Sequence, residues 1–252
     1  MTFDVAAEAY TRFMGRFSEP LAGRFVERVS LRPGQRALDV GCGPGALTAE
    51  LVRRLGPAHV TAIDPSASFV AAVRERMPGV DVREARAERL PFADASFDLA
   101  LAQLVVHFMT DPVAGLAEMG RVTRPGGPVG ACVWDHAGGA GPLSLFWRAV
   151  HDLDPRTTGE AGLAGVGQGQ LLDLSRAAGL RDGEESRLTV TLTFASFDDW
   201  WDPFTLGVGP AGAYVAGLAP AAVAALRDRC RQLLPPPPFA VTASAWCVLA
   251  RR

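Results

Sequence analysis

The stretch Ala37-Leu-Asp-Val-Gly-Cys-Gly-Pro-Gly45 decides the fold, because a short apolar run carrying one carboxylate leads into three closely spaced glycines. Glycine adopts positive φ angles at little cost, and without a Cβ it lets a ligand approach the backbone. Apolar residues then recur with helical spacing over residues 46–55. The pattern predicts a strand, a sharp turn and a helix whose first N–H groups face a ligand.

The glycine turn alone leaves its ligand open. Gly41, Gly43 and Ala46 satisfy the relaxed dinucleotide pattern G-x-G-x-x-G/A. Asp64 follows about 20 residues further on, where a ribose-binding acid is expected. A nicotinamide or flavin dinucleotide is therefore one interpretation, and another nucleoside-containing cofactor is the alternative.

Strand-like and helix-like segments alternate along the chain. Residues 4–30 predict two helices broken near Ser18-Glu-Pro20, since proline interrupts helical hydrogen bonding. The segments that follow are a strand at 36–41, a helix at 46–55, a strand at 59–63, a helix at 66–76, strands at 80–84 and 97–102, a helix at 111–123 and a strand at 128–134. Later segments are helices at 143–152, 168–178 and 221–234 and strands at 186–194 and 239–250. This alternation is typical of an α/β fold with a parallel sheet.

Composition excludes several function classes. The 252 residues, 48% of them hydrophobic, favour one domain with a cap over two full domains. The net charge is -2 and the basic residues are scattered, so we expect no nucleic-acid partner. All 25 basic residues are arginine, and a chain without lysine cannot form a Schiff base.

The cysteines and the N-terminal segment favour a cytoplasmic protein. Cys42, Cys132, Cys230 and Cys247 are far apart and lack a metal-ligand spacing, so we expect reduced, buried thiols and no metal site. The N-terminal segment has no apolar signal core, and no segment reaches the roughly 18 apolar residues of a membrane span. We therefore expect no membrane partner.

Five sequence blocks resemble class I S-adenosylmethionine (SAM)-dependent methyltransferases of the methyltransferase domain 11 family. They are Leu38–Gly45, Ile63-Asp-Pro-Ser66, Ala87-Glu-Arg-Leu-Pro-Phe92, Ser96-Phe-Asp-Leu99 and Arg121-Val-Thr-Arg-Pro-Gly-Gly127, and they come in the family's order. The chain is most similar to the small-molecule branch that includes ubiquinone and menaquinone methyltransferases. The resemblance implies a Rossmann-like, seven-stranded, mostly parallel sheet whose antiparallel last strand is inserted beside strand six.

The same resemblance implies a division of residues 1–252 as a single domain. N-terminal helices (1–35) precede the SAM-binding core (36–134), two helical cap segments (135–183 and 196–235) cover the substrate, and a final strand pair (186–194 and 239–250) completes the sheet. The implied cofactor is SAM, with S-adenosylhomocysteine (SAH) as its product. The implied partner is a small-molecule acceptor, and the chain is expected to be a monomer or a homodimer.

The resemblance assigns the family's site positions to individual residues of this chain. The implied cofactor-binding residues are Tyr10, Asp39, Gly41, Cys42, Gly43, Gly45, Asp64, Pro65, Ser66, Ala87, Glu88, Gln103, Leu104 and His107. In the family an acid at Asp39 lies near the methionine amino group, and one at Asp64 accepts both ribose hydroxyls. Asp64 could instead cap the helix near Ser66.

One position departs from the family pattern. An acidic residue that accepts from the adenine amino group usually stands where this chain has Arg86. Arginine only donates hydrogen bonds. Arg86 could therefore stack on the adenine or pair with Glu84 or Glu88, and it leaves adenine recognition open.

Candidate catalytic and acceptor-binding residues follow the fourth strand and fill the cap. His107 and His136 are candidate general bases, because histidine titrates near neutrality, although His107 could also be a structural histidine. Aromatic residues of the two cap segments form either a core or an apolar lid suited to a flat or hydrophobic acceptor. They are Trp134, Phe146, Trp147, Trp200, Trp201, Phe204 and Tyr214.

Three functions remain open. The first is methyl transfer to a small molecule by in-line displacement, which needs mainly alignment of the reactants. Ala102-Gln-Leu-Val105 lacks the residues that base-modifying amino-methyltransferases place there, and no Pro-Cys nucleophile is present. The second is a SAM-binding protein without methyltransferase activity, either a regulator or an enzyme of other chemistry. The third is an NAD(P)-dependent oxidoreductase.

Overall fold

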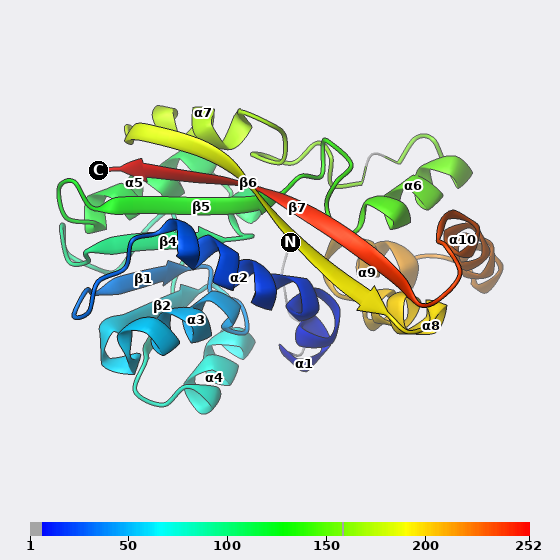
Figure 1. Cartoon of the computed structure of the whole chain (residues 1–252), viewed down its shortest axis with the longest axis horizontal. Coiled ribbons are helices and arrows are strands. Elements are labelled where there is room, and N and C mark those ends of the chain that lie inside the picture. Colours follow the sequence, from blue (N-terminus) through cyan, green and yellow to red (C-terminus); the bar gives the residue numbers. More distant parts are fainter. Residues whose placement is uncertain (1–6, 158) are drawn as a thin grey trace.

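A seven-stranded sheet forms the centre of the computed structural model, which describes residues 7–157 and 159–252 (Figure 1). The strands are β1 (Ala37–Val40), β2 (Val60–Asp64), β3 (Asp81–Glu84), β4 (Leu99–Gln103), β5 (Pro128–Trp134), β6 (Arg181–Phe194) and β7 (Phe239–Arg251). Their order is β3-β2-β1-β4-β5-β7-β6. Strands β1 to β5 pair in parallel, and β7 runs antiparallel to both β5 and β6. The predicted insertion of an antiparallel last strand is confirmed.

The strand order reverses direction between β1 and β4. From β1 the chain moves outward through β2 to β3, then returns to place β4 on the other side of β1. In open α/β sheets such a reversal opens a crevice beyond the carboxyl ends of the strands, where ligands bind. The glycine turn follows β1 directly, so it lies at this crevice.

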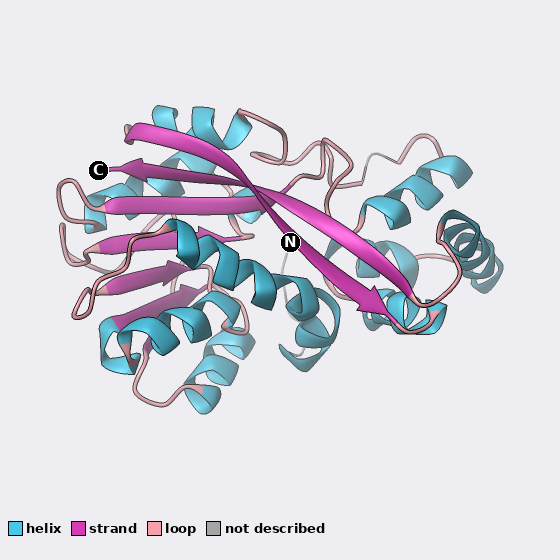
Figure 2. Cartoon of the chain, viewed as in Figure 1, coloured by secondary structure: helices cyan, strands magenta, loops and turns pink. Residues whose placement is uncertain are grey.

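Helices cover both faces of the sheet (Figure 2). On one face lie α2 (Arg16–Arg28), α3 (Ala46–Leu55) and α4 (Ala67–Arg76), and on the other α5 (Pro112–Val122) and α7 (Gln170–Ala177). Each helix buries one apolar stripe, as α3 does with its leucines at helical spacing. The expected helices and parallel strands are therefore present, with ends that differ by a few residues.

The N-terminal helices differ from the prediction. The structure has α1 (Ala7–Tyr10), a π-helical turn η1 (Thr11–Gly15) and then an unbroken α2 that contains Pro20. The predicted break near Ser18-Glu-Pro20 is wrong, because Pro20 lies close to the start of α2 and removes a single hydrogen bond. Burial of the apolar face of α2 outweighs that loss.

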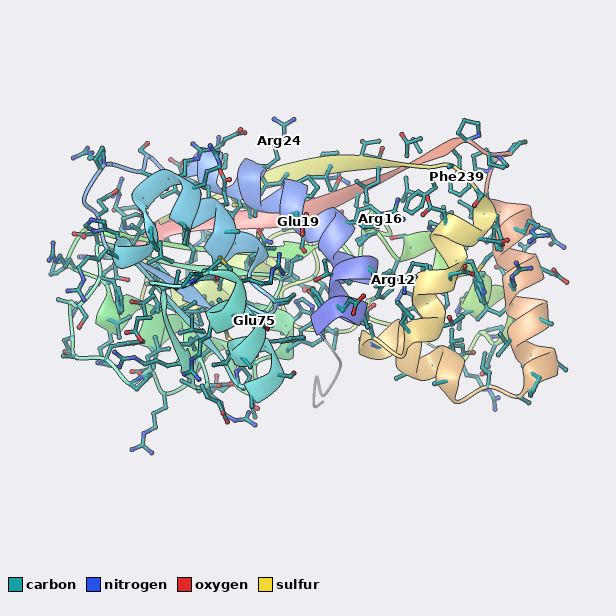
Figure 3. The ribbon with its side chains drawn as sticks, turned by 90° about the horizontal axis from the view of Figure 1, so that it is seen from below. Arg12, Arg16, Glu19, Arg24, Glu75 and Phe239 are labelled. Carbon is teal, nitrogen blue, oxygen red and sulfur yellow. The ribbon has the colours of Figure 1, made fainter. Side chains whose placement is uncertain are left out.

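A helical cap lies at one end of the sheet. It consists of α6 (Ser144–Leu153), α8 (Phe197–Trp201), η4 (Asp202–Leu206), α9 (Gly209–Ala216) and α10 (Pro220–Leu233). Strands β6 and β7 extend past the others into this cap (Figure 1). Figure 3 shows α2 between the sheet and the cap, and there Arg16 donates to Asp199 of α8 at 2.8 Å.

Strand β6 begins earlier than the predicted residue 186. Its first residues, Arg181–Arg187, are polar and mostly exposed, so they carry no apolar alternation. Pairing with β7, rather than local preference, makes them a strand. Among the described helices, none is long and apolar enough to cross a membrane.

Candidate active site

A cavity of about 380 Å³, here called the main cavity, opens at the carboxyl ends of β1, β2 and β4. Its volume lies in the range of small-molecule sites. Most of the predicted cofactor-binding residues line it: Tyr10, Asp39, Gly41, Cys42, Gly43, Asp64, Pro65, Ser66, Ala87, Glu88, Gln103 and Leu104. Gly45 and His107 do not. Phe69, Phe108 and Met109 line it without having been predicted, because an apolar wall carries no distinctive sequence pattern.

The three glycines of the turn serve different purposes. Gly41 has φ +72° and packs so closely that a Cβ there would lie 2.3 Å from Val105 Cγ2. Gly45 has φ +99°, and its Cβ would meet the Met77 side chain. A Cβ on Gly43, at φ +52°, would meet no described atom within 4 Å. Packing therefore requires Gly41, positive φ favours glycine at Gly45, where the flexible end of Met77 can shift, and Gly43 leaves space open beside the main cavity.

Asp64 ties the glycine turn to the end of β2. Its Oδ2 accepts from the Gly43 N–H and its Oδ1 from the Ser66 N–H, both at 2.8 Å. Burial raises the pKa of Asp64, and these two hydrogen bonds oppose that shift. Each carboxylate oxygen accepts one backbone N–H and keeps a further lone pair for a ligand hydroxyl. Asp64 therefore stabilises the turn, whereas α4, whose N-cap residue is Ser66, has no side-chain cap among the described residues.

Asp39 is fully buried on β1 and has one unused oxygen. Its Oδ2 accepts from Thr48 Oγ1 at 2.6 Å, while Oδ1 finds no partner among the described residues. Burial, above all, raises the pKa of Asp39 to about 7; the Thr48 hydrogen bond opposes this shift and the nearby charge of Asp64 adds to it. An unpaired buried carboxylate oxygen favours a cationic, hydrogen-bonding ligand group.

The end of β4 supplies a second unpaired acceptor. Gln103 donates through Nε2 to the Ser18 carbonyl at 2.9 Å, and its buried Oε1 has no partner in the part of the chain that the structure describes. The next residue, Leu104, has φ +60°. That conformation costs a leucine about 1–2 kcal/mol. Strain of this kind is concentrated at ligand sites, and here it turns the chain at the cavity wall.

The residues after β3 include Glu88, a predicted cofactor-binding residue, and Arg86, whose role the sequence leaves open. Glu88 lines the main cavity, but its Oε1 already accepts from the Thr110 N–H at 2.7 Å and the Asp111 N–H at 3.4 Å. Arg86 also lines the cavity, and no ion pair of the described residues joins it to Glu84 or Glu88. Its guanidinium is therefore oriented by neither carboxylate.

A smaller cavity of about 40 Å³, here called the side cavity, adjoins the main one. Tyr10, Leu104 and Phe108 line both cavities. The remaining walls are Phe13, Met14, His107, Trp134, His136, Leu143, Glu160 and Val208–Ala211. The structure thus brings both predicted catalytic histidines to the same small space, beside the cofactor pocket rather than within it.

Both histidines are neutral in this environment. Burial lowers the pKa of His107 to about 3 and that of His136 to about 4. Their ring centroids lie 6.0 Å apart, and His107 Nδ1 has no hydrogen-bond partner within residues 7–157 and 159–252. Such low pKa values make both histidines weak bases at neutral pH.

Glu160 was not predicted as a site residue. It lies in the connection between α6 and α7, is 4% exposed, and accepts from Trp147 Nε1 at 2.8 Å. Burial raises the pKa of Glu160 to about 7. Burial, above all, raises the pKa of Tyr10 to about 12, and the nearby charges of Asp64 and Glu160 contribute to this shift. The Tyr10 hydroxyl therefore keeps its proton. A single glutamate in a glycine-rich loop forms no recognisable motif, so the sequence did not identify Glu160 as a site residue.

The aromatic residues that the sequence assigned to either a core or a lid mainly form the core of the cap. Phe146 stacks on Phe204 with ring centroids 4.5 Å apart, and Trp147 lies 5.9 Å from Tyr214. Of the seven aromatic residues, only Trp134 lines the side cavity. All four cysteines are buried and unbridged, and no group of three described metal-ligating residues is close enough to hold a metal ion.

Comparison with known proteins locates the similarity in the first half of the chain. Residues 38–130 match the family model of a methyltransferase domain. The chain is 37% identical over 128 residues to a malonyl-[acyl-carrier protein] O-methyltransferase of Erwinia billingiae, covering 50% of this chain and 49% of that protein. It is 39% identical over 102 residues to the demethylmenaquinone methyltransferase of Beutenbergia cavernae, covering 40% and 42%. The matches therefore span about half or less of the curated relatives' length.

Solved structures extend the likeness to the whole fold. A candidate methyltransferase of Bacillus halodurans superposes with a TM-score of 0.60 at 16% identity, covering 91% of this chain and 97% of that one. The [4+2]-cyclase SpnF superposes with a TM-score of 0.56 at 25% identity, covering 92% and 80%. Residues 38–130 thus match the methyltransferase domain indicated by the five sequence blocks, and the solved structures support the Rossmann-like fold.

Proposed function

We propose that this chain, which carries a class I SAM-dependent methyltransferase domain, transfers a methyl group to a small-molecule acceptor. The observation that carries the proposal is the pair of carboxylates, Asp39 and Asp64, at the carboxyl ends of β1 and β2. Residues 1–252 would act as one domain, since β6 and β7 run from the sheet into the cap.

The lining of the main cavity fits SAM. Among the described residues it holds three carboxylates, Asp39, Asp64 and Glu88, against the one guanidinium of Arg86. This excess of negative charge suits a cofactor that carries a sulfonium and an ammonium group. The unpaired oxygens of Asp39 and Gln103 suit the ammonium, and the free lone pairs of Asp64 suit two ribose hydroxyls.

The residues would then bind and align rather than react. When bound, SAM supplies a methyl group activated by the positive charge on sulfur. Asp64 would fix the ribose, Asp39 and Gln103 the amino end, and the protonated Tyr10 hydroxyl would donate to the carboxylate. Alignment alone can be worth an effective concentration of about 10⁵ M or more.

The acceptor would be small and largely apolar next to its reacting group. The side cavity is narrow, and Phe13, Met14 and Leu143 are among its walls. We further propose a cytoplasmic monomer or homodimer, in keeping with the four free thiols. Analytical ultracentrifugation would distinguish the two oligomeric states.

A second candidate is a SAM-binding enzyme of other chemistry. It is favoured by the whole-chain likeness to SpnF, a [4+2]-cyclase, at 25% identity. In that case the main cavity would bind SAM without methyl transfer.

Calorimetric titration with SAM and SAH, followed by an acceptor screen with labelled methyl-SAM, tests both candidates. We expect binding of SAM and SAH and transfer of label to at least one small molecule. Binding without turnover on any acceptor would favour the second candidate, and failure of both ligands to bind would overturn both. NAD and NADP are the matched controls, and neither should raise the melting temperature.

A further inference from the structure

Among the described residues, Glu160 is the one acidic side chain on the wall of the side cavity. The connection between α6 and α7 brings it to the same cavity lining as His107 of η3 (Val106–Phe108). The indole N–H of Trp147 donates to Oε2 at 2.8 Å and so fixes the carboxyl group. The other oxygen, Oε1, is not engaged by Trp147.

Within the described part of the chain, two residues of the same cavity lining have buried nitrogen atoms without partners. Trp134 Nε1 is buried and has no acceptor among the described residues, and His107 Nδ1 is buried without a partner as well. An indole N–H can only donate, whereas an ionised carboxylate can only accept. A ligand group that pairs with both residues must therefore donate to the carboxylate of Glu160 and accept from the indole of Trp134.

The charges around the side cavity further limit the kinds of ligand group that it can bind. None of the described arginines lines the side cavity, so a carboxylate or phosphate would face Glu160 without a cationic partner. An ammonium group could donate to Glu160, but it has no lone pair for the indole N–H of Trp134. Burial also disfavours cations here, as it does for both histidines. A neutral hydroxyl meets every condition.

We propose that the side cavity receives the hydroxyl end of a neutral alcohol or phenol acceptor, and that Glu160 is the general base that takes its proton. This inference rests on the proposed methyltransferase function. The hydroxyl oxygen forms a bond to the methyl carbon and gives its proton to the Glu160 carboxylate. The electron pair of the broken carbon–sulfur bond stays on sulfur, which leaves neutral SAH.

The titration behaviour of the cavity supports this assignment over the two histidines. A general base works best when its pKa lies near the working pH. Burial places the pKa of Glu160 at about 7, whereas it lowers those of His107 and His136 to about 3 and 4. The histidines then serve as neutral hydrogen-bonding partners of the acceptor.

Glu160→Gln tests the proposal with Glu185→Gln as its matched control. Glu185 is a part-buried carboxylate that accepts from the Gly169 N–H and lines neither cavity. Calorimetry with SAH should give the same affinity for the wild type and both variants. If the wild type fails to bind SAH, the proposed function fails, and the Glu160 assignment is not the cause.

The acceptor class is tested on the SAH-loaded protein with three matched probes: benzyl alcohol, benzylamine and benzoate. The indole resonance of Trp147, assigned with Trp147→Phe, reports binding next to Glu160. Benzyl alcohol should bind at least about tenfold more tightly than the charged probes, and Glu160→Gln should weaken it about tenfold. Equal or tighter binding of benzylamine or benzoate, no effect of Glu160→Gln, or no binding of benzyl alcohol would overturn the proposal.

Catalysis provides the second readout. For a hydroxyl acceptor that the wild type methylates, Glu160→Gln should lower kcat by about 10²–10⁴-fold and remove the rise of kcat through pH 7. A change in KM alone would contradict a general-base role. A screen in which only amines or carboxylates are methylated would contradict the acceptor class.

Discussion

The main cavity and the side cavity share Tyr10, Leu104 and Phe108, yet their other walls come from different parts of the chain. The main cavity is built from turns that directly follow strands, where backbone N–H groups hold the carboxylate of Asp64. The side cavity takes Glu160 from a cap loop, where a side chain holds the carboxylate instead.

This difference explains why sequence motifs predict the main cavity. Turns after parallel strands impose local requirements, such as glycine at positive φ, and these appear as short motifs. A cap contact requires only that tertiary packing brings two distant residues together, as it does for Trp147 and Glu160. Backbone geometry thus shapes the main cavity, and cap packing shapes the side cavity.

The largest expected effect is a difference in stability between variants of two glycines in the same turn. Gly41→Ala should lower the free energy of unfolding by about 2–5 kcal/mol, because a clash with Val105 adds to the cost of positive φ. Gly43→Ala should cost only the backbone term, about 1–2 kcal/mol, and weaken SAM instead. Urea unfolding without ligand measures both, and equal losses would contradict the packing role of Gly41.

The next effect concerns the ribose. Asp64→Ala should weaken SAM binding by about 1–3 kcal/mol, the cost of unpaired ribose hydroxyls, while the protein still folds. Calorimetric titration measures the affinity, and circular dichroism checks the fold. The control is Asp81→Ala, which removes an exposed carboxylate paired with Arg83 on the edge strand. Unchanged SAM affinity in Asp64→Ala would disprove the ribose assignment.

The smallest effect is the pH dependence of SAM binding. Burial raises the pKa of Asp39 to about 7 in the ligand-free protein, so the carboxylate that suits an ammonium group forms only as the pH rises through that value. SAM should therefore bind about eightfold more tightly at pH 7.5 than at pH 6. In Asp39→Asn this dependence should be absent, and its persistence would assign it to another group.

Much of the fold was predictable because its signals are local. The apolar strand before Gly41, the acid at Asp64 and the order of the five blocks gave the sheet and the cofactor. Polar residues at the start of β6 and the proline in α2 misled the prediction, since strand pairing and burial override local preference there. Glu160 could not be predicted, because its environment is created by residues distant in sequence.

The long β6–β7 ladder has a consequence for how the protein moves. Its pairing runs without interruption from Glu184 opposite Leu249 to Phe194 opposite Phe239, so the same hydrogen-bonded strands belong to the sheet and to the cap. A hinge swing of the whole cap would have to break or bend that ladder. We therefore expect the sheet and the cap to unfold as one cooperative unit. We expect an acceptor to reach the side cavity through local displacement of short elements such as α9, whose first residues line it.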